Sequence, residues 1–151
     1  MYKRILAAID WTDSTEAVLD QTRRLASLTG GAVHVVHVRA TDFQSVPQML
    51  GSMASRTPLG ESVETEAGGV ARRMVEDAVA ALVAAGVDAE GVLLDSAPGN
   101  VPRTVLERAR ELDAELIVLG SRNHNRPSAL FRSNVADEVS RQATCPVLIV
   151  P

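Results

Sequence analysis

Aromatic residues, cysteine and long apolar runs are all scarce in this 151-residue sequence. Aromatic residues make up 3% of it, so the core must be built from Val, Leu, Ile and Ala, and a surface that stacks nucleic-acid bases on aromatic rings is disfavoured. The single cysteine, Cys145, can form neither an intrachain disulfide nor a CxxC pair, which favours a reducing compartment. No apolar run approaches the roughly 20 residues of a membrane-spanning helix.

Excess positive charge is also absent, because 15 Lys and Arg residues face 19 Asp and Glu residues, which gives a net charge of −4. A global basic surface for DNA or RNA is therefore excluded. The N-terminus runs straight into a short apolar segment rather than into the longer apolar region of a signal peptide. We expect a cytoplasmic protein with no nucleic-acid or membrane partner, and the length predicts one domain over residues 1–151.

Five short apolar runs have the character of strands, and segments with helical periodicity separate them. The runs are residues 5–9, 33–38, 91–94, 116–119 and 146–150. Runs that are apolar on both faces and end in turn residues are typical of parallel strands. The order β-α-β, a long connection, then α-β-α-β-α-β predicts a doubly wound parallel sheet of the α/β class.

Four segments repeat apolar residues at helical spacing. The first opens at Asp13 and Glu16, which have the spacing of a capping box, and stops at Gly30 and Gly31; Gly86 ends the second. The apolar positions are Val18, Leu25 and Leu28 in the first helix, Ala71, Met74, Val75, Ala78, Leu82 and Ala85 in the second, Val105, Ala109 and Leu112 in the third, and Val135, Val139 and Ala143 in the fourth.

The segment from residue 40 to about residue 66 has no clear periodicity. Part of it, around Val46, Met49, Leu50 and Met53, has the spacing of a short helix. A structureless connection of this length is uncommon in a compact domain. It is either a functional flap over the sheet edge or an insertion without function.

Two strand ends carry residues suited to ligand binding. In open α/β sheets, ligands bind outside the carboxyl ends of the strands. Asp10 follows the first strand directly, so its carboxylate can accept a hydrogen bond from an adenine amino group or a ribose hydroxyl; the alternative is an ordinary helix-capping Asp. Residues 120–134 contain three arginines and no acid before the last helix, which fits either a phosphate site or a solvated loop.

Four segments resemble the universal stress protein family, and the resemblance covers the whole chain. They are residues 3–10, 34–38, 113–122 and 143–150, which are similar to the family's first, second, fourth and last strands with their flanks. The resemblance implies a Rossmann-like, adenine nucleotide alpha hydrolase-like sheet of five parallel strands in the order 3-2-1-4-5. It also implies a homodimer in which the last strands of two subunits, from Pro146 to Val150, pair with each other.

The family's nucleotide-binding members carry the pattern G-x2-G-x9-G-[S/T] over the loop before the last helix. Gly120 matches the first position, while Asn123, Ser133 and Asn134 occupy the others at unchanged spacing. Asn tolerates the left-handed conformation that glycine supplies, whereas Ser133 either intrudes on the phosphate position or caps the last helix. The resemblance implies ATP or AMP, with Mg²⁺, as ligand, and places at the nucleotide Ala8, Ile9, Asp10, Val38, Gly120, Arg122, Asn123, Ser133, Asn134 and Val135.

Trp11 is a further departure from the family, which usually has a small residue after this Asp. Its ring could stack on an adenine, block the adenine pocket, or pack against the long connection.

The sequence therefore leaves two functions open: a stress-response protein that binds an adenine nucleotide, and a dimeric interaction scaffold that binds none. We expect no catalysis, because the loop at residues 120–134 supplies cations and hydroxyls but no acid to hold a metal for phosphoryl transfer.

Overall fold

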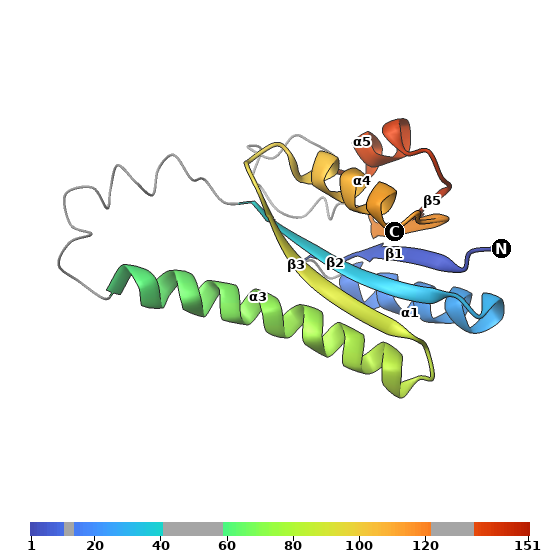
Figure 1. Ribbon diagram of the computed structural model, residues 1–151, viewed down its shortest axis with the longest axis horizontal. Helices are drawn as coiled ribbons and strands as arrows, with labels where there is room; N and C mark the ends of the chain where they lie inside the picture. The colour runs from blue at the N-terminus through green and yellow to red at the C-terminus, as the bar shows by residue number, and fades with distance from the viewer. Residues whose placement is uncertain (11–13, 41–58, 122–134) are drawn as a thin grey trace.

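The computed structural model describes residues 1–10, 14–40, 59–121 and 135–151, and its centre is a five-stranded parallel sheet (Figure 1). The strand order β3-β2-β1-β4-β5 confirms the predicted 3-2-1-4-5 topology. The strands are β1 (Arg4–Ala8), β2 (Ala32–Ala40), β3 (Ala89–Ser96), β4 (Leu116–Gly120) and β5 (Val147–Val150). All neighbouring pairs are parallel, so the carboxyl ends of all strands lie at one edge of the sheet.

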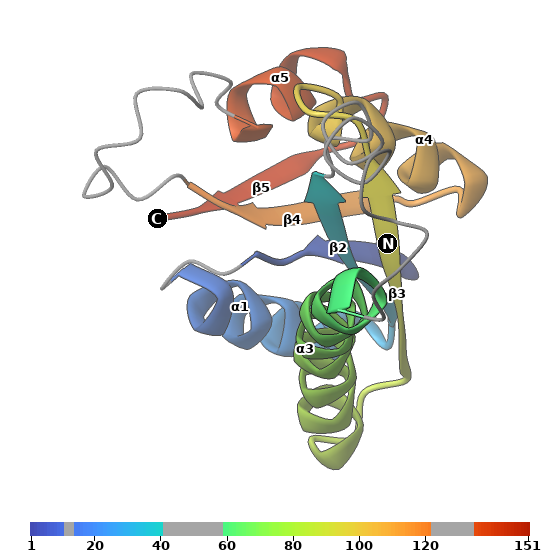
Figure 2. The same cartoon turned by 90° about the vertical axis from the view of Figure 1, so that its left-hand side faces the viewer.

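In the described ranges, two helices cover each face of the sheet (Figure 2). One layer consists of α1 (Ser14–Thr29) and α3 (Leu59–Ala84), and the other of α4 (Val101–Glu111) and α5 (Val135–Gln142). Each layer has its own core, because alternate strand residues point to opposite faces. Val33 and Val35 of β2 belong to the cluster on the face of α1 and α3, and Val36 and Val38 belong to the cluster on the face of α4 and α5.

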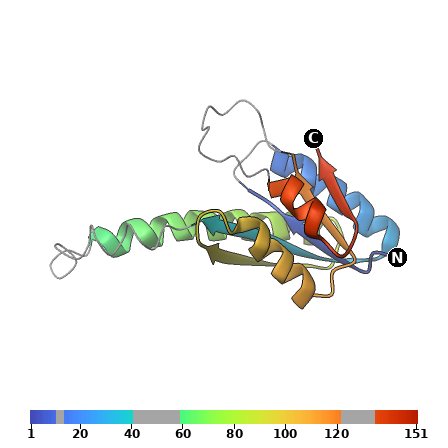
Figure 3. The same cartoon turned by 90° about the horizontal axis from the view of Figure 1, so that it is seen from above.

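The predicted helices are present, with differences at their ends. α3 begins at Leu59, so residues 59–66, expected to be irregular, are helical, and this end of the helix projects beyond the sheet (Figure 3). Leu28 is 84% exposed, so the prediction that it lies on the buried face of α1 is wrong; Thr22 and Ala26 are buried instead. Ala85 likewise lies outside α3 and is exposed.

Two predicted turns contain glycine in the left-handed conformation that its missing side chain permits. Gly30, with φ of 67°, ends α1, and its N–H donates to the Ala26 carbonyl at 2.8 Å. Gly86, with φ of 83°, lies two residues beyond the end of α3, and its N–H donates to the Val83 carbonyl at 2.9 Å. The expected capping role of Asp13 and the possible helix around Met49 lie outside the described residues.

No helix in the described ranges combines the length and apolar character needed to cross a membrane.

Candidate functional site

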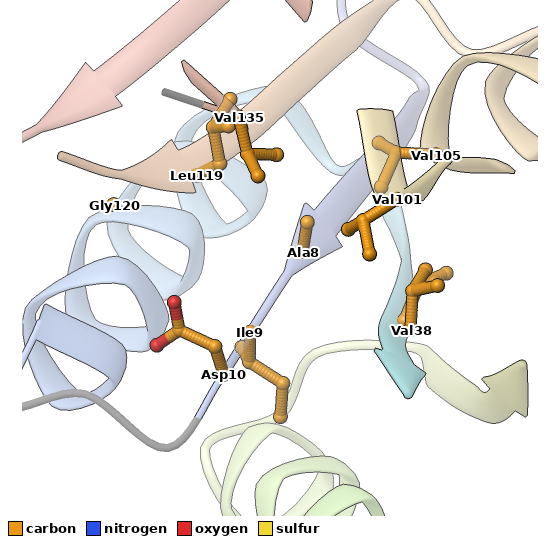
Figure 4. A pocket seen from close by; sticks show the side chains of 10 residues that line it. Ala8, Ile9, Asp10, Val38, Val101, Val105, Leu119, Gly120 and Val135 are labelled. Carbon is orange, nitrogen blue, oxygen red and sulfur yellow. The ribbon is translucent and has the colours of Figure 1, made fainter. Parts of the chain in front are cut away.

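A small cavity lies at the carboxyl ends of the central strands (Figure 4). Its volume is about 80 Å³, and ten residues from β1, β2, β4, α4 and α5 or their flanks line it. The side chains of Val38, Val101 and Val105 lie on one side of it, and those of Leu119 and Val135 on the other. The described residues of the lining are Ala8, Ile9, Asp10, Val36, Val38, Val101, Val105, Leu119, Gly120 and Val135.

Six residues of the predicted nucleotide site line this one cavity: Ala8, Ile9, Asp10, Val38, Gly120 and Val135. The other four, Arg122, Asn123, Ser133 and Asn134, lie outside the described residues, as does Trp11. Sequence reasoning missed the apolar wall formed by Val36, Val101, Val105 and Leu119. Val36 could have been found from Val38, because residues two apart in a strand share a face. The four-residue spacing of Val101 and Val105 puts them on one helix face but does not place that face at the strand ends.

Among the described residues that line the cavity, Asp10 is the one that carries a charge. Asp10 is exposed, and its side chain points away from that of Ile9 (Figure 4). The Thr15 hydroxyl, in the first turn of α1, donates to the Asp10 carbonyl oxygen at 2.5 Å, and it accepts from the Asp10 N–H at 3.3 Å. Thr15 Oγ1 also lies 3.5 Å from Asp10 Oδ1. The main chain of Asp10 is therefore held to the start of α1 while its carboxylate faces the strand ends.

Ile9 contributes its main chain rather than its side chain to the cavity. Its side chain is 4% exposed and belongs to the core cluster on the face of α1 and α3, opposite to the valines of the cavity. Its N–H donates to the Val36 carbonyl at 2.9 Å, one residue beyond the end of β1. The peptide between Ile9 and Asp10 therefore forms the edge of the cavity at the point where β1 leaves the sheet.

The main chain of Val38 also faces the place where β1 leaves the sheet. Along β2 the Ala32 N–H bonds to Lys3 on the side of β1, and the Val33 N–H bonds to Asp88 on the side of β3. Because the direction of the main-chain groups alternates along a strand, even-numbered residues of β2 face β1. β1 ends at Ala8, which is paired with Val36, so the N–H and C=O of Val38 face the space beyond the strand end.

Gly120 allows β4 to end in direct contact with the start of α1. A Cβ at this position would lie 2.3 Å from Ser14 Oγ and 2.9 Å from Ser14 Cβ, both too close for a real contact. The structure therefore gives a reason for this glycine besides the glycine pattern: it lets Ser14 pack on the strand end beside the cavity.

Gly120→Ala should lower the free energy of unfolding by about 1–3 kcal/mol, the usual cost of overpacking. Chemical denaturation measures this change. In a Ser14→Gly background, which removes both close atoms, the same substitution should cost less than half as much. Equal costs in the two backgrounds would show that Ser14 is not the reason for the glycine.

The electrostatics of the described wall favour neutral hydrogen-bond donors over phosphate. Nine of the ten lining residues are apolar, and the tenth is an acid. α5 begins at Val135 beside the cavity, but Asp137 and Glu138 already place negative charge in its first turn, where the helix dipole would otherwise attract an anion. Asp137 is paired with Arg141. A phosphate would need cations from elsewhere.

Other candidate groups lie away from the cavity and have structural explanations. His34 and His37 fall on opposite faces of β2, as predicted, and His34 Nδ1 lies 2.7 Å from Glu90 Oε1 on β3. The described ranges contain no group of three His, Cys, Asp or Glu residues able to hold a metal. Cys145 packs against the core on the face of α4 and α5, and burial raises the pKa of its thiol, so it is a poor nucleophile.

A second groove, larger than the strand-end cavity, lies between α1 and α3, on the face of the sheet opposite to α4 and α5. Its volume is about 440 Å³, and residues such as Leu19, Val70 and Met74 line it. It contains none of the predicted site residues, and it lies on the helix layer rather than at the strand ends.

Comparison with known proteins supports one family over the full chain. Residues 1–151 match the model of the Universal stress protein family. The universal stress protein YxiE of Bacillus subtilis is 27% identical over 150 residues, which cover 99% of this chain and 99% of that protein.

Solved structures of the same family have the same fold. A protein of the universal stress protein family from Burkholderia pseudomallei is 27% identical, with a TM-score of 0.71 over 99% of this chain and 96% of that one. The universal stress protein from Archaeoglobus fulgidus in complex with dAMP is 26% identical, with a TM-score of 0.65 over 99% of this chain and 98% of that one.

Proposed function

Because the chain belongs to the universal stress protein family, we propose that it is a cytoplasmic stress-response protein, one domain over residues 1–151, that binds an adenine nucleotide in the strand-end cavity. The observation that carries the proposal is the meeting of Asp10 with an apolar wall at the carboxyl ends of β1, β2 and β4. The dAMP complex of the relative from Archaeoglobus fulgidus supports this choice of ligand.

The size and polarity of the cavity favour the base as the buried part of the ligand. Pockets that enclose a whole small molecule usually measure about 300–1,000 Å³. A cavity of about 80 Å³ lined by valines can bury only the edge of a flat apolar ring. The main-chain groups of Val38 would bond to the base edge, and Asp10 would accept from the adenine amino group or from a ribose hydroxyl.

The phosphates would be bound by residues of the segment 122–134 rather than by the acidic, described wall of the cavity. In the proposed complex Arg122 supplies positive charge, and Asn123, Ser133 and Asn134 supply hydrogen-bond donors. A Mg²⁺ ion bound with ATP would be held mainly by the phosphates and water, as is usual for this ion. Within the part of the lining that the structure describes, Asp10 supplies the one carboxylate that could assist.

Nucleotide binding should raise the thermal stability of the protein. At about 100 times its dissociation constant, a ligand adds roughly 2.7 kcal/mol to the free energy of unfolding. For a chain of this size that corresponds to an increase in Tm of about 5–10 °C. Scanning calorimetry with AMP, ADP and MgATP at millimolar concentration, with GMP as the matched control, measures it. No shift with any adenine nucleotide would overturn the proposal.

We further propose that the nucleotide is bound rather than rapidly hydrolysed. Asp10 is the single acid among the described lining residues, whereas phosphoryl transfer needs acids that hold a metal and a group that positions the nucleophile. The function would then reside in the difference between the free and the nucleotide-bound protein.

We propose a homodimer through β5, which is the outer strand beside β4. Ile149, in the middle of this short strand, is 40% exposed, and an exposed apolar edge strand is a ready template for pairing. Pro146 lies just before the strand and Pro151 just after it, so neither interrupts its main-chain donors.

Ile149→Lys should shift the protein from dimer to monomer, because a charge at the edge opposes strand pairing. Light scattering at micromolar concentration measures the mass, and Leu28→Lys, at a more exposed apolar position on α1, is the control. A wild-type protein that is already monomeric at this concentration would refute the dimer.

A further inference from the structure

His37 is a buried polar side chain within the apolar strand β2. It is 5% exposed, and it lies between Val36 and Val38, which are both buried. By the alternation of β2, its ring lies on the face of α1 and α3, the face on which the Ile9 side chain also packs. Burying an imidazole costs free energy unless its ring nitrogens are hydrogen-bonded, so its partner indicates its role.

That partner is the carbonyl group of the residue that precedes Asp10. His37 Nδ1 lies 2.8 Å from the Ile9 carbonyl oxygen. A carbonyl oxygen can only accept, so Nδ1 carries the proton in this bond. The main-chain bonds between β1 and β2 run as far as the Ile9 N–H and the Val36 carbonyl, and the His37 ring supplies the next bond.

We propose that His37 is a positioning residue of the nucleotide site, acting from behind the sheet on the peptide between Ile9 and Asp10. This inference rests on the proposed function. The Thr15 hydroxyl, on α1, donates to the Asp10 carbonyl, and His37, on β2, donates to the Ile9 carbonyl. The peptide groups before and after the Asp10 Cα are therefore held by two different elements. The carboxylate of Asp10 then has a defined direction before any ligand arrives.

The same bond affects the main chain of Val38. In a continued parallel ladder, the Ile9 carbonyl would accept from the Val38 N–H. No main-chain bond joins these two described residues: the His37 ring takes one of the two acceptor positions on the Ile9 carbonyl, and Val38 lines the cavity. His37 would thus fix the positions of the Asp10 carboxylate and the Val38 N–H, the two polar groups proposed for adenosine recognition. Its own side chain lies on the face of α1 and α3, away from the valines of the cavity.

Three variants separate positioning from general stability. His37→Leu removes the donor at nearly constant volume. His37→Asn keeps an amide N–H donor at the same distance from the main chain. Val33→Ala, on the same strand and the same face, weakens the same core cluster without contacting Ile9.

The affinity for AMP, measured by titration calorimetry, distinguishes these variants. His37→Leu should weaken binding by roughly three- to tenfold, the factor that corresponds to one net hydrogen bond. His37→Asn should restore affinity to within about twofold of the wild type, and Val33→Ala should lower Tm without changing affinity. Unchanged affinity in His37→Leu would overturn the positioning role.

An NMR measurement without ligand tests the same bond separately. The imidazole ¹⁵N signals of His37 should show a protonated Nδ1, and the ¹³C signal of the Ile9 carbonyl should move in His37→Leu and return in His37→Asn. A His37 protonated only at Nε2 would overturn the inference even if AMP binds. If the wild type binds no adenine nucleotide, the proposed function fails, and the NMR signals still decide whether His37 fixes the Ile9 carbonyl.

Discussion

Asp10→Ala should weaken AMP binding by about 10- to 100-fold, the range for a lost hydrogen bond to a charged group. The carboxylate is the one charge among the described lining residues, which are otherwise apolar, so none of these neighbours can replace it. Folding should change little, since Asp10 is exposed and its main chain, which Thr15 holds, is retained. Titration calorimetry gives the affinity, and the Tm of the free variant checks the fold.

Matched ligands identify which hydrogen of the nucleotide Asp10 accepts. If it accepts from the ribose, the variant and the wild type should bind 2′,3′-dideoxy-AMP equally. If it accepts from the adenine amino group, they should bind inosine monophosphate equally. Asp77→Ala, an exposed acid on α3, is the control and should bind AMP like the wild type. An Asp10→Ala protein with wild-type affinity for AMP would remove Asp10 from the site.

Gly31→Ala should lower the free energy of unfolding by about 2–3 kcal/mol, at the upper end of the usual cost of overpacking. A Cβ on Gly31 would lie 2.2 Å from the Tyr2 carbonyl oxygen, which is main chain and cannot rotate away. The next residue, Ala32, bonds through its N–H to the Lys3 carbonyl at 2.8 Å. Relief of the clash would therefore strain the start of the pairing between β1 and β2.

Gly69→Ala is the matched control, because a Cβ there meets nothing within 4 Å. Gly69 lies inside α3, so this substitution should stabilise the protein by about 0.5–1 kcal/mol through helix propensity. The two glycine substitutions thus have opposite expected signs. Urea denaturation at constant m-value measures both, and a stabilised Gly31→Ala protein would contradict the close approach.

The sheet was predictable because its strands are short and apolar on both faces. For residues 5–9 and 116–119, apolar composition and the turn residues at their ends were enough to predict strands. These residues form β1 and β4, whose ends lie within one residue of the expected ones. β3 was predicted too short, as Glu90 and Asp95 interrupt its apolar pattern. These residues pair with His34 and Arg39 on β2, so contacts across the sheet supply what the local sequence lacks.

The first turns of α3 were not predictable for a related reason. Residues 59–69 contain three glycines and several polar residues, and their pattern shows no apolar stripe. For Leu28 the prediction erred in the other direction. Helical spacing placed it on the buried face of α1, yet the neighbouring elements do not cover its side chain, which is exposed to solvent. Periodicity reports which residues can share a face, but the width of the covering layer decides how many are buried.

For the candidate site, the rule that ligands bind at strand ends was sufficient to find Asp10 and Gly120. It could not find Val101 and Val105, because these lie on the helix that follows β3, and only the three-dimensional arrangement brings them to the end of β1. Nor could it find the bond from His37 to Ile9, since the sequence shows only a histidine in a strand. Polar groups inside apolar runs are the signal to examine in such sequences.

The two rims of the sheet differ in how much sequence change they should tolerate. At the rim where the strands begin, Gly31 touches the main chain of Tyr2, and any side chain there disturbs strand pairing. At the rim where the strands end, apart from Asp10 and Gly120, the described lining consists of apolar side chains on β1, β2, β4, α4 and α5 or their flanks that can be exchanged for others of similar bulk. Ligand preference can therefore diverge at one rim while the other preserves the architecture, which makes the molecule a favourable starting point for directed evolution of new binding specificities.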